Sequence, residues 1–115
     1  MINGAHVVIY SSDAEADRVF FRDVLGMPCV DAGRGWLIFK APPAEIAFHP
    51  ATSVHSHELM LMCEDLIGTM AELQAKGVEF TRPVEQLAWG LLTGLRLPGG
   101  GDLALYEPSH PRANG

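Results

Sequence analysis

Two tryptophans stand in glycine-flanked turns, Trp36 in GRGWL and Trp89 in LAWGL, where few neighbours in sequence can cover a large ring. Together with thioethers such as those of Met60 and Met62, indole rings form an adaptable apolar surface that holds a flat or polycyclic ligand by stacking. Taken alone, the two methionines are more typical of core filling. Arg96 can pair with an anionic ligand group or with a surface acid. These residue types favour non-covalent binding of an aromatic small molecule.

The sequence lacks the usual patterns of several catalytic centres. It has no G-x-S-x-G elbow, and the glycines at 99–101 do not precede a helix, as a phosphate-binding loop would require. Cys29 and Cys63 stand alone, without a second cysteine or a histidine at zinc-finger spacing. We expect two free, buried thiols in a reducing compartment, although a disulfide between them is compatible with the sequence. The expected location is the cytoplasm.

Length and charge narrow the class of protein. The 115 residues fit one domain, and 48% hydrophobic with 19% charged residues is typical of a globular core former. A formal charge of −6 with scattered basic residues argues against nucleic acid or an anionic membrane as a partner. The sequence contains neither an apolar stretch of membrane-spanning length nor a signal-peptide pattern.

The chain reads as one pattern repeated twice. A β-branched segment at 5–10 predicts a strand, residues 11–26 predict a capped helix, and 29–31, 36–40 and 45–49 predict three short strands. The second copy has a strand at 57–63, a helix at 66–76 closed by Gly77, and strands at 78–81, 91–97 and 102–107. Pro83 and the turn at 98–101 are expected to separate those strands. His6 precedes Gly26 by twenty residues, as His57 precedes Gly77, so one offset superposes the two halves. Each half alone would expose the apolar face of its sheet, so the two halves must share a core.

The sequence resembles the vicinal-oxygen-chelate superfamily, the glyoxalase, bleomycin-resistance and extradiol-dioxygenase group. The resemblance is carried by residues 5–27, 44–50, 63–80 and 95–108 in this order, nearly the whole chain. It implies an α+β fold in which two β-α-β-β-β modules form an open, curved, eight-stranded mixed sheet with the helices on its convex side. The modules would span 4–50 and 57–108 of a single domain at 1–115, joined by a linker at 51–56.

Metalloenzymes of this superfamily hold a divalent ion with one side chain from each of four strands, which leaves positions open for two substrate oxygens. The resemblance places His6 at the first ligand position and Glu45 at the second. Alternation directs His6 to the concave side and the Val7/Ile9 face to the helices, and likewise separates Glu45 from Ile46 and Phe48. A strand-end histidine and a solvated carboxylate are the simpler interpretations of the same two residues.

The other two ligand positions are less well matched. Superposing the halves makes His57 the third ligand, whereas aligning on the helix gives Glu58, which would face the cavity with Met60 and Met62. Ala104 stands at the fourth position and cannot coordinate a metal. Glu107 alternates to the opposite face. A set of His6, Glu45 and either His57 or Glu58 would hold Fe, Mn, Ni or Zn weakly, so we expect no cofactor or a weakly held divalent metal.

The resemblance implies a ligand site on the concave face, with the tryptophans at its rim. We predict a cytoplasmic, homodimeric protein that binds or sequesters a small molecule, an aromatic antibiotic for example, as bleomycin-resistance members do. The alternative is a metal-dependent enzyme, either a glyoxalase-like lyase or isomerase or an extradiol-type dioxygenase. The predicted ligand-binding residues are Tyr10, Trp36, His49, Met60, Met62, Trp89, Arg96 and Tyr106, with Ala47 and Ala104 beside them.

Overall fold

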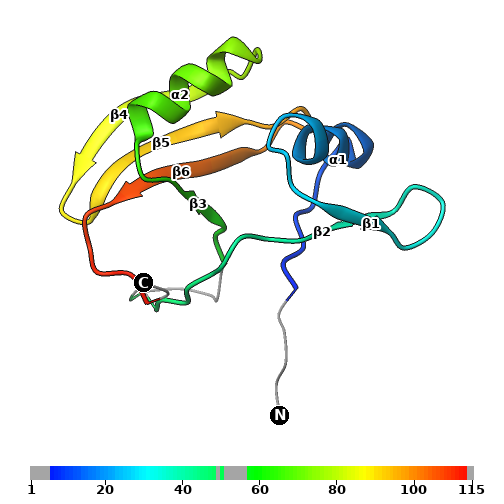
Figure 1. Ribbon diagram of the computed structural model, residues 1–115, viewed down its shortest axis with the longest axis horizontal. Coiled ribbons are helices and arrows are strands. Elements are labelled where there is room, and N and C mark those ends of the chain that lie inside the picture. Colours follow the sequence, from blue (N-terminus) through cyan, green and yellow to red (C-terminus); the bar gives the residue numbers. More distant parts are fainter. Residues whose placement is uncertain (1–5, 49, 51–56, 114–115) are drawn as a thin grey trace.

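The computed structural model describes residues 6–48, 50 and 57–113. The described residues form an α+β fold, with a two-stranded sheet, a four-stranded sheet and two helices (Figure 1). In chain order the elements are α1 (Ala14–Asp23), β1 (Cys29–Asp31), β2 (Leu37–Phe39), β3 (Met60–Met62), α2 (Leu66–Ala75), β4 (Phe80–Leu87), β5 (Gly90–Arg96) and β6 (Asp102–Pro108).

The four-stranded sheet is built entirely by the second half of the chain. Its strand order is β3-β6-β5-β4, with β3 parallel to β6 and the other neighbours antiparallel. The strand, helix and three further strands predicted for 57–107 are all present, so the pattern of the second module is confirmed. This sheet positions most of the residues that the sequence singles out.

Helix α2 begins and ends where local signals place it. The Asp65 carboxylate accepts a hydrogen bond from the Gly68 backbone N–H at 3.1 Å and caps the first turn. At the other end Gly77 adopts a φ of +86°, a left-handed conformation that glycine takes without steric cost. The predicted caps of this helix are therefore correct.

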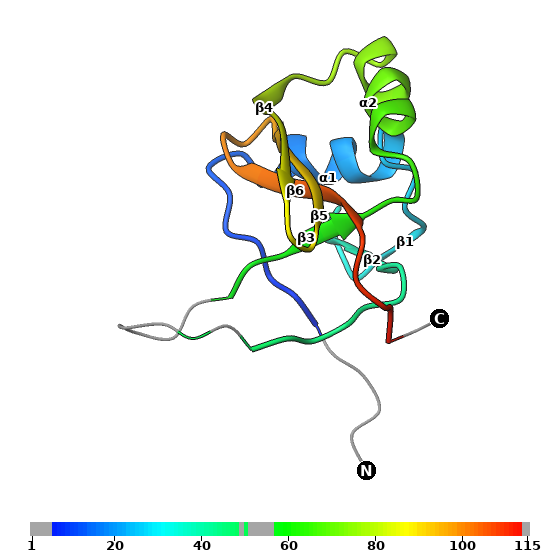
Figure 2. The ribbon, with the colours of Figure 1, turned by 90° about the vertical axis from the view of Figure 1, so that its left-hand side faces the viewer.

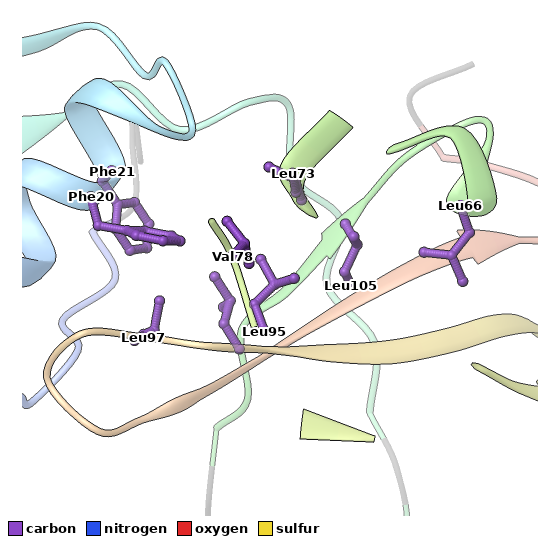
Figure 3. Packing of buried hydrophobic residues seen from close by; sticks show 9 residues of the cluster. Phe20, Phe21, Leu66, Leu73, Val78, Leu95, Leu97 and Leu105 are labelled. Atoms are coloured by element: carbon purple, nitrogen blue, oxygen red, sulfur yellow. The ribbon is translucent and has the colours of Figure 1, made fainter. Parts of the chain in front are cut away.

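Both helices lie on the same side of the four-stranded sheet (Figures 1 and 2). Leu66 of α2 and Leu95 of β5 are completely buried between the layers, and α1 adds two phenylalanine rings (Figure 3). Burial of this apolar surface supplies the main stabilisation of the fold. The buried cluster consists of Phe20, Phe21, Leu66, Leu73, Val78, Leu95, Leu97, Leu103 and Leu105.

A buried carboxylate joins α1 to the far turn of the sheet. Asp17 is 8% exposed, and its Oδ1 accepts a hydrogen bond from the Gly99 backbone N–H at 2.7 Å. The Ser12 hydroxyl donates to the Gly99 carbonyl at 2.7 Å. A Cβ at position 99 would collide with Ser11 Oγ and lie 2.7 Å from Asp17 Oδ2, so a larger residue would displace these side chains. The turn predicted at 98–101 thus anchors the first half of the chain to the second.

Pro83 lies inside a strand, and its prediction as a separator was wrong. Strand β4 runs through it, with register shifts between Phe80 and Arg82 and between Arg82 and Glu85. Proline is tolerated here because β4 is an edge strand, where its missing N–H costs no ladder bond on the outer side. The bulged edge also discourages pairing with another strand.

The first half of the chain departs further from the prediction. The expected strands at 29–31 and 36–40 are present as β1 and β2, paired antiparallel. The structure assigns no strand to residues 6–10 or 45–48, so six strands in two sheets replace the expected eight among the described residues. A segment joins a sheet only where a neighbour offers its backbone groups, and alternation alone cannot identify that neighbour.

The side chains of these two segments are also placed differently from the expectation. Val7 and Ile9 are 63% and 42% exposed, although alternation predicted that they pack against the helices. Ile46 and Phe48 are 83% and 95% exposed, again contrary to the prediction. Apolar side chains at such exposure lack the burial that would stabilise them, so these four residues do not add to the core.

Candidate functional site

The two faces of the four-stranded sheet differ in composition. Leu61, Leu105 and Thr93 share one register row on the helix side. The next residues along the strands point the other way, since side chains alternate across a sheet. We call the opposite surface the helix-free face; Met60, Met62, Ala104, Tyr106 and Leu92 lie on it. The orientation predicted for the two methionines agrees with this placement.

Trp89 lies at the two-residue turn between β4 and β5, and its ring contacts Tyr106 on the helix-free face. Its ring is 5.1 Å from that of Tyr106, with an angle of 82° between the planes, an edge-to-face contact. The adjacent Gly90 lets the start of β5 lie close to β6, because a Cβ there would collide with the Glu107 carbonyl oxygen. Trp89 keeps 37% of its surface exposed, so part of the ring is available to a ligand.

The Tyr106 hydroxyl has a partner that the sequence did not reveal. Tyr106 Oη lies 3.2 Å from Nε2 of His110, and the two rings are 6.0 Å apart. Burial raises the pKa of Tyr106, with a smaller contribution from the negative charge of Glu45. The phenol therefore keeps its proton at neutral pH. His110 follows Pro108 outside the repeated pattern, so no periodicity pointed to it.

The predicted metal ligands do not assemble in the described chain. His6, His57 and Glu58 are exposed, and the Glu45 carboxylate accepts a hydrogen bond from the Ala113 backbone N–H. Within residues 6–48, 50 and 57–113, no three His, Cys, Asp or Glu side chains are grouped closely enough to hold a metal ion. Ala104, at the fourth ligand position, is buried and offers no donor atom. In this arrangement the described residues therefore do not assemble a divalent-metal site.

The remaining predicted ligand residues lie apart from Trp89 and Tyr106. Trp36 is 61% exposed at the turn between β1 and β2, with the Arg18 guanidinium 4.6 Å above its ring. Tyr10 is 94% exposed on the segment before α1. Arg96 lies at the opposite end of β5 from the Trp89 turn, in register with Asp102. His49 lies outside the described residues, so its predicted role has no structural counterpart.

The structure therefore gathers four of the eight predicted ligand residues and separates three. Met60, Met62 and Tyr106 come together through the β3–β6 register, and Trp89 joins them through its turn. Trp36 and Tyr10 do not join that group, because the first module does not continue the sheet in this chain. Arg96 does not join it because it lies at the far end of β5 from the Trp89 turn.

Both cysteines are free thiols, as expected, but they are half-buried rather than buried. The Cys63 thiol donates to the Tyr106 backbone carbonyl at 3.7 Å. Desolvation raises the pKa of Cys63, so its thiol is a poor nucleophile. This contact is structural, since it fixes β3 against β6.

Two shallow hollows lie away from the helix-free face. One of about 510 Å³ is lined by residues of α1 and by Pro98, and one of about 330 Å³ lies at the β1–β2 hairpin. Neither contains a predicted ligand residue, and neither carries converging polar groups of the kind that orient a ligand. The grouping of Trp89 with Tyr106 is the better candidate site.

Comparison with known proteins identifies the family. A family model described as "Glyoxalase/Bleomycin resistance protein/Dioxygenase superfamily" matches residues 4–110. A search of the curated proteins finds no match. No helix in the described part of the chain is long and apolar enough to cross a membrane.

Solved structures share the fold at low sequence identity. A lactoylglutathione lyase from Agrobacterium tumefaciens is 16% identical, with 91% of this chain and 92% of that chain covered and a TM-score of 0.66. TnmS3, an antibiotic binding protein from Streptomyces sp. CB03234, is 24% identical, with 95% and 100% covered and a TM-score of 0.64. A superfamily member from Sphaerobacter thermophilus is 24% identical, with 92% and 98% covered and a TM-score of 0.65. With nearly the whole sequence matched, the chain belongs to the glyoxalase/bleomycin resistance/dioxygenase superfamily, the vicinal-oxygen-chelate group.

Proposed function

We propose that this protein binds a planar aromatic small molecule, of the antibiotic class, and sequesters it without chemical change. The observation that carries the proposal is the edge-to-face pair of Trp89 and Tyr106, with Met62 of β3 in register beside Tyr106. A half-exposed indole held in a fixed orientation offers a stacking surface that needs little ordering when a ligand binds. The resemblance to TnmS3 in fold, and its description as an antibiotic binding protein, support the same class of function.

The residue at the fourth ligand position favours binding over metal catalysis. Ala104 stands on β6 between Met60 and Gly94, in a row that contains no coordinating side chain. The alternative function, a metal-dependent lyase, isomerase or dioxygenase, would require His6 and Glu45 to meet His57 or Glu58 in an assembly.

Titration and metal analysis of the purified protein test the proposal together. The Trp36→Phe variant leaves Trp89 as the single tryptophan, and its fluorescence should be quenched by hydroxymethyl-anthraquinone, a flat neutral probe. The Trp89→Phe variant, which keeps only Trp36, should show little quenching. Metal content should lie well below one equivalent and should not change in His6→Ala. One equivalent of Fe, Mn, Ni or Zn that is lost in His6→Ala would establish the enzyme instead.

A second copy of the chain is proposed to complete the site as a homodimer. The large hydrophobic side chains at 7–10, together with Ile46 and Phe48, are exposed. The short strand β3 lies at one edge of the four-stranded sheet, and its outer side is open to an added strand, whereas the β4 edge is bulged at Pro83. Pairing at the β3 edge would bring apolar side chains of the partner next to Met60 and Met62.

Light scattering at micromolar concentration should give twice the mass of the chain. The Tyr10→Asp variant should shift the protein towards monomer, with a dissociation constant raised about tenfold or more, because it places a charge in the proposed interface. Val30→Asp is the matched control, since Val30 is 66% exposed on β1 and outside the proposed interface. A wild-type protein that is monomeric at these concentrations would contradict the homodimer.

A further inference from the structure

His110 is held in a defined position by the turn that carries Trp89. The Ser109 backbone N–H donates to the Trp89 carbonyl at 3.0 Å, and the Ser109 hydroxyl donates to the Ala88 carbonyl at 3.4 Å. These bonds direct the chain leaving β6 back over the end of the helix-free face. Tyr106 is thereby contacted by two rings, the indole of Trp89 and the imidazole of His110.

The hydrogen bonds of His110 define which of its nitrogens carries the proton. Nδ1 lies 2.7 Å from the carbonyl oxygen of Pro111, an atom that can only accept. The Nδ1–H therefore donates to Pro111, and the lone pair of neutral imidazole remains on Nε2. Because Nε2 is the acceptor, the Tyr106 hydroxyl donates to it across 3.2 Å.

This arrangement leaves the phenol oxygen of Tyr106 with acceptor capacity only. A tyrosine hydroxyl has one proton and two lone pairs, and the proton is engaged by His110. The charged groups that act on this hydroxyl are Glu45, which raises its pKa, and Arg112, which lowers it less than burial and Glu45 raise it. The group is therefore a neutral acceptor placed at the edge of the aromatic site.

We propose that the site selects aromatic ligands carrying a hydroxyl donor: Tyr106 Oη accepts the ligand hydroxyl, and His110 is the positioning residue that keeps Oη an acceptor. This inference rests on the proposed binding function and names the ligand class. A phenol whose own proton were free would serve ligand donors and ligand acceptors alike. Because the Tyr106 hydroxyl already donates its proton to Nε2 of His110, it can only accept from a ligand, and it therefore favours ligands that carry a donor.

A matched ligand pair separates this proposal from binding in general. Calorimetry at about pH 8 compares hydroxymethyl-anthraquinone with its methyl ether, methoxymethyl-anthraquinone, which has the same rings and no donor. The wild type should prefer the alcohol by about three- to tenfold, the range of one net hydrogen bond. In Tyr106→Phe and His110→Ala the preference for the alcohol over the ether should fall to less than about twofold. His110→Gln should restore the preference, because its amide oxygen can accept from Tyr106.

The two proposals fail in different ways. If neither compound binds, both the binding function and this inference are overturned. If the wild type binds both compounds equally, or if His110→Ala keeps the preference for the alcohol, the inference is overturned and the binding function stands. Circular dichroism of each variant, compared with that of the wild type, shows whether the variant is folded.

Discussion

Replacing Trp89 with alanine is expected to weaken the binding of hydroxymethyl-anthraquinone by about 30-fold, the effect of losing one central aromatic anchor. The substitution removes the exposed stacking surface and also the edge contact that orients Tyr106 at 5.1 Å. Trp89 lies in a turn and is 37% exposed, so its loss creates no core cavity. The effect should therefore appear in ligand affinity far more than in stability.

Calorimetry on Trp89→Ala, with Trp36→Ala as the matched control, measures this effect. Both residues are tryptophans in hairpin turns, but Trp36 lies on the separate two-stranded sheet beneath Arg18. Trp36→Ala should change the affinity by less than about twofold, as expected for a residue outside the contact. Equal losses in both variants, or no loss in Trp89→Ala, would contradict the placement of the site on the helix-free face.

Replacing Leu95 with alanine is expected to lower the free energy of unfolding by about 2–5 kcal/mol. Leu95 is completely buried in the middle of β5, within the cluster that both helices contact (Figure 3). Truncation loses the transfer free energy of the removed carbons and leaves a cavity that the surrounding leucines and phenylalanines only partly fill. A domain of this size has about 5–15 kcal/mol of stability, so the variant should be close to unfolding.

Urea denaturation followed by circular dichroism gives the free energy change from the shift of the midpoint. Ile67→Ala is the control, because Ile67 is in α2 and 61% exposed, and its loss should cost less than about 0.5 kcal/mol. Comparable destabilisation by the two substitutions would mean that Leu95 does not lie in the core. Any Leu95→Ala protein that stays folded should keep its affinity for the probe, since Leu95 points away from the helix-free face.

The second module follows from the sequence because its signals are local. Alternation predicts that Met60 and Met62 share a face with Ala104 and Tyr106, and the register of β3 with β6 agrees with that prediction. The cap at Asp65 and the left-handed turn at Gly77 act within a few residues of themselves. Such features require no knowledge of the rest of the chain.

In the first module, local sequence signals do not predict which segments join a sheet. Residues 6–10 and 45–48 have strand composition, yet a strand forms only when another edge accepts it, and in this chain neither segment is in a strand. The predicted metal set depended on those two strands, because His6 and Glu45 lie on them. The absence of a group of three donors in the described chain follows from that arrangement as much as from Ala104.

The sequence by itself determined the α+β class, the elements of the second module and the residues that face away from its helices. Only the tertiary structure decided that Trp89 meets Tyr106, that Trp36 and Arg96 do not, and that Asp17 is buried against Gly99. It also placed His110, which no pattern marked, on the Tyr106 hydroxyl. The reason is that alternation and helix capping depend on residues that are close in sequence. These contacts instead depend on how segments that are distant in sequence pack against one another. Of the stacking residues predicted from the sequence, the candidate site therefore keeps those that the β4–β5 turn and the β3–β6 register bring together.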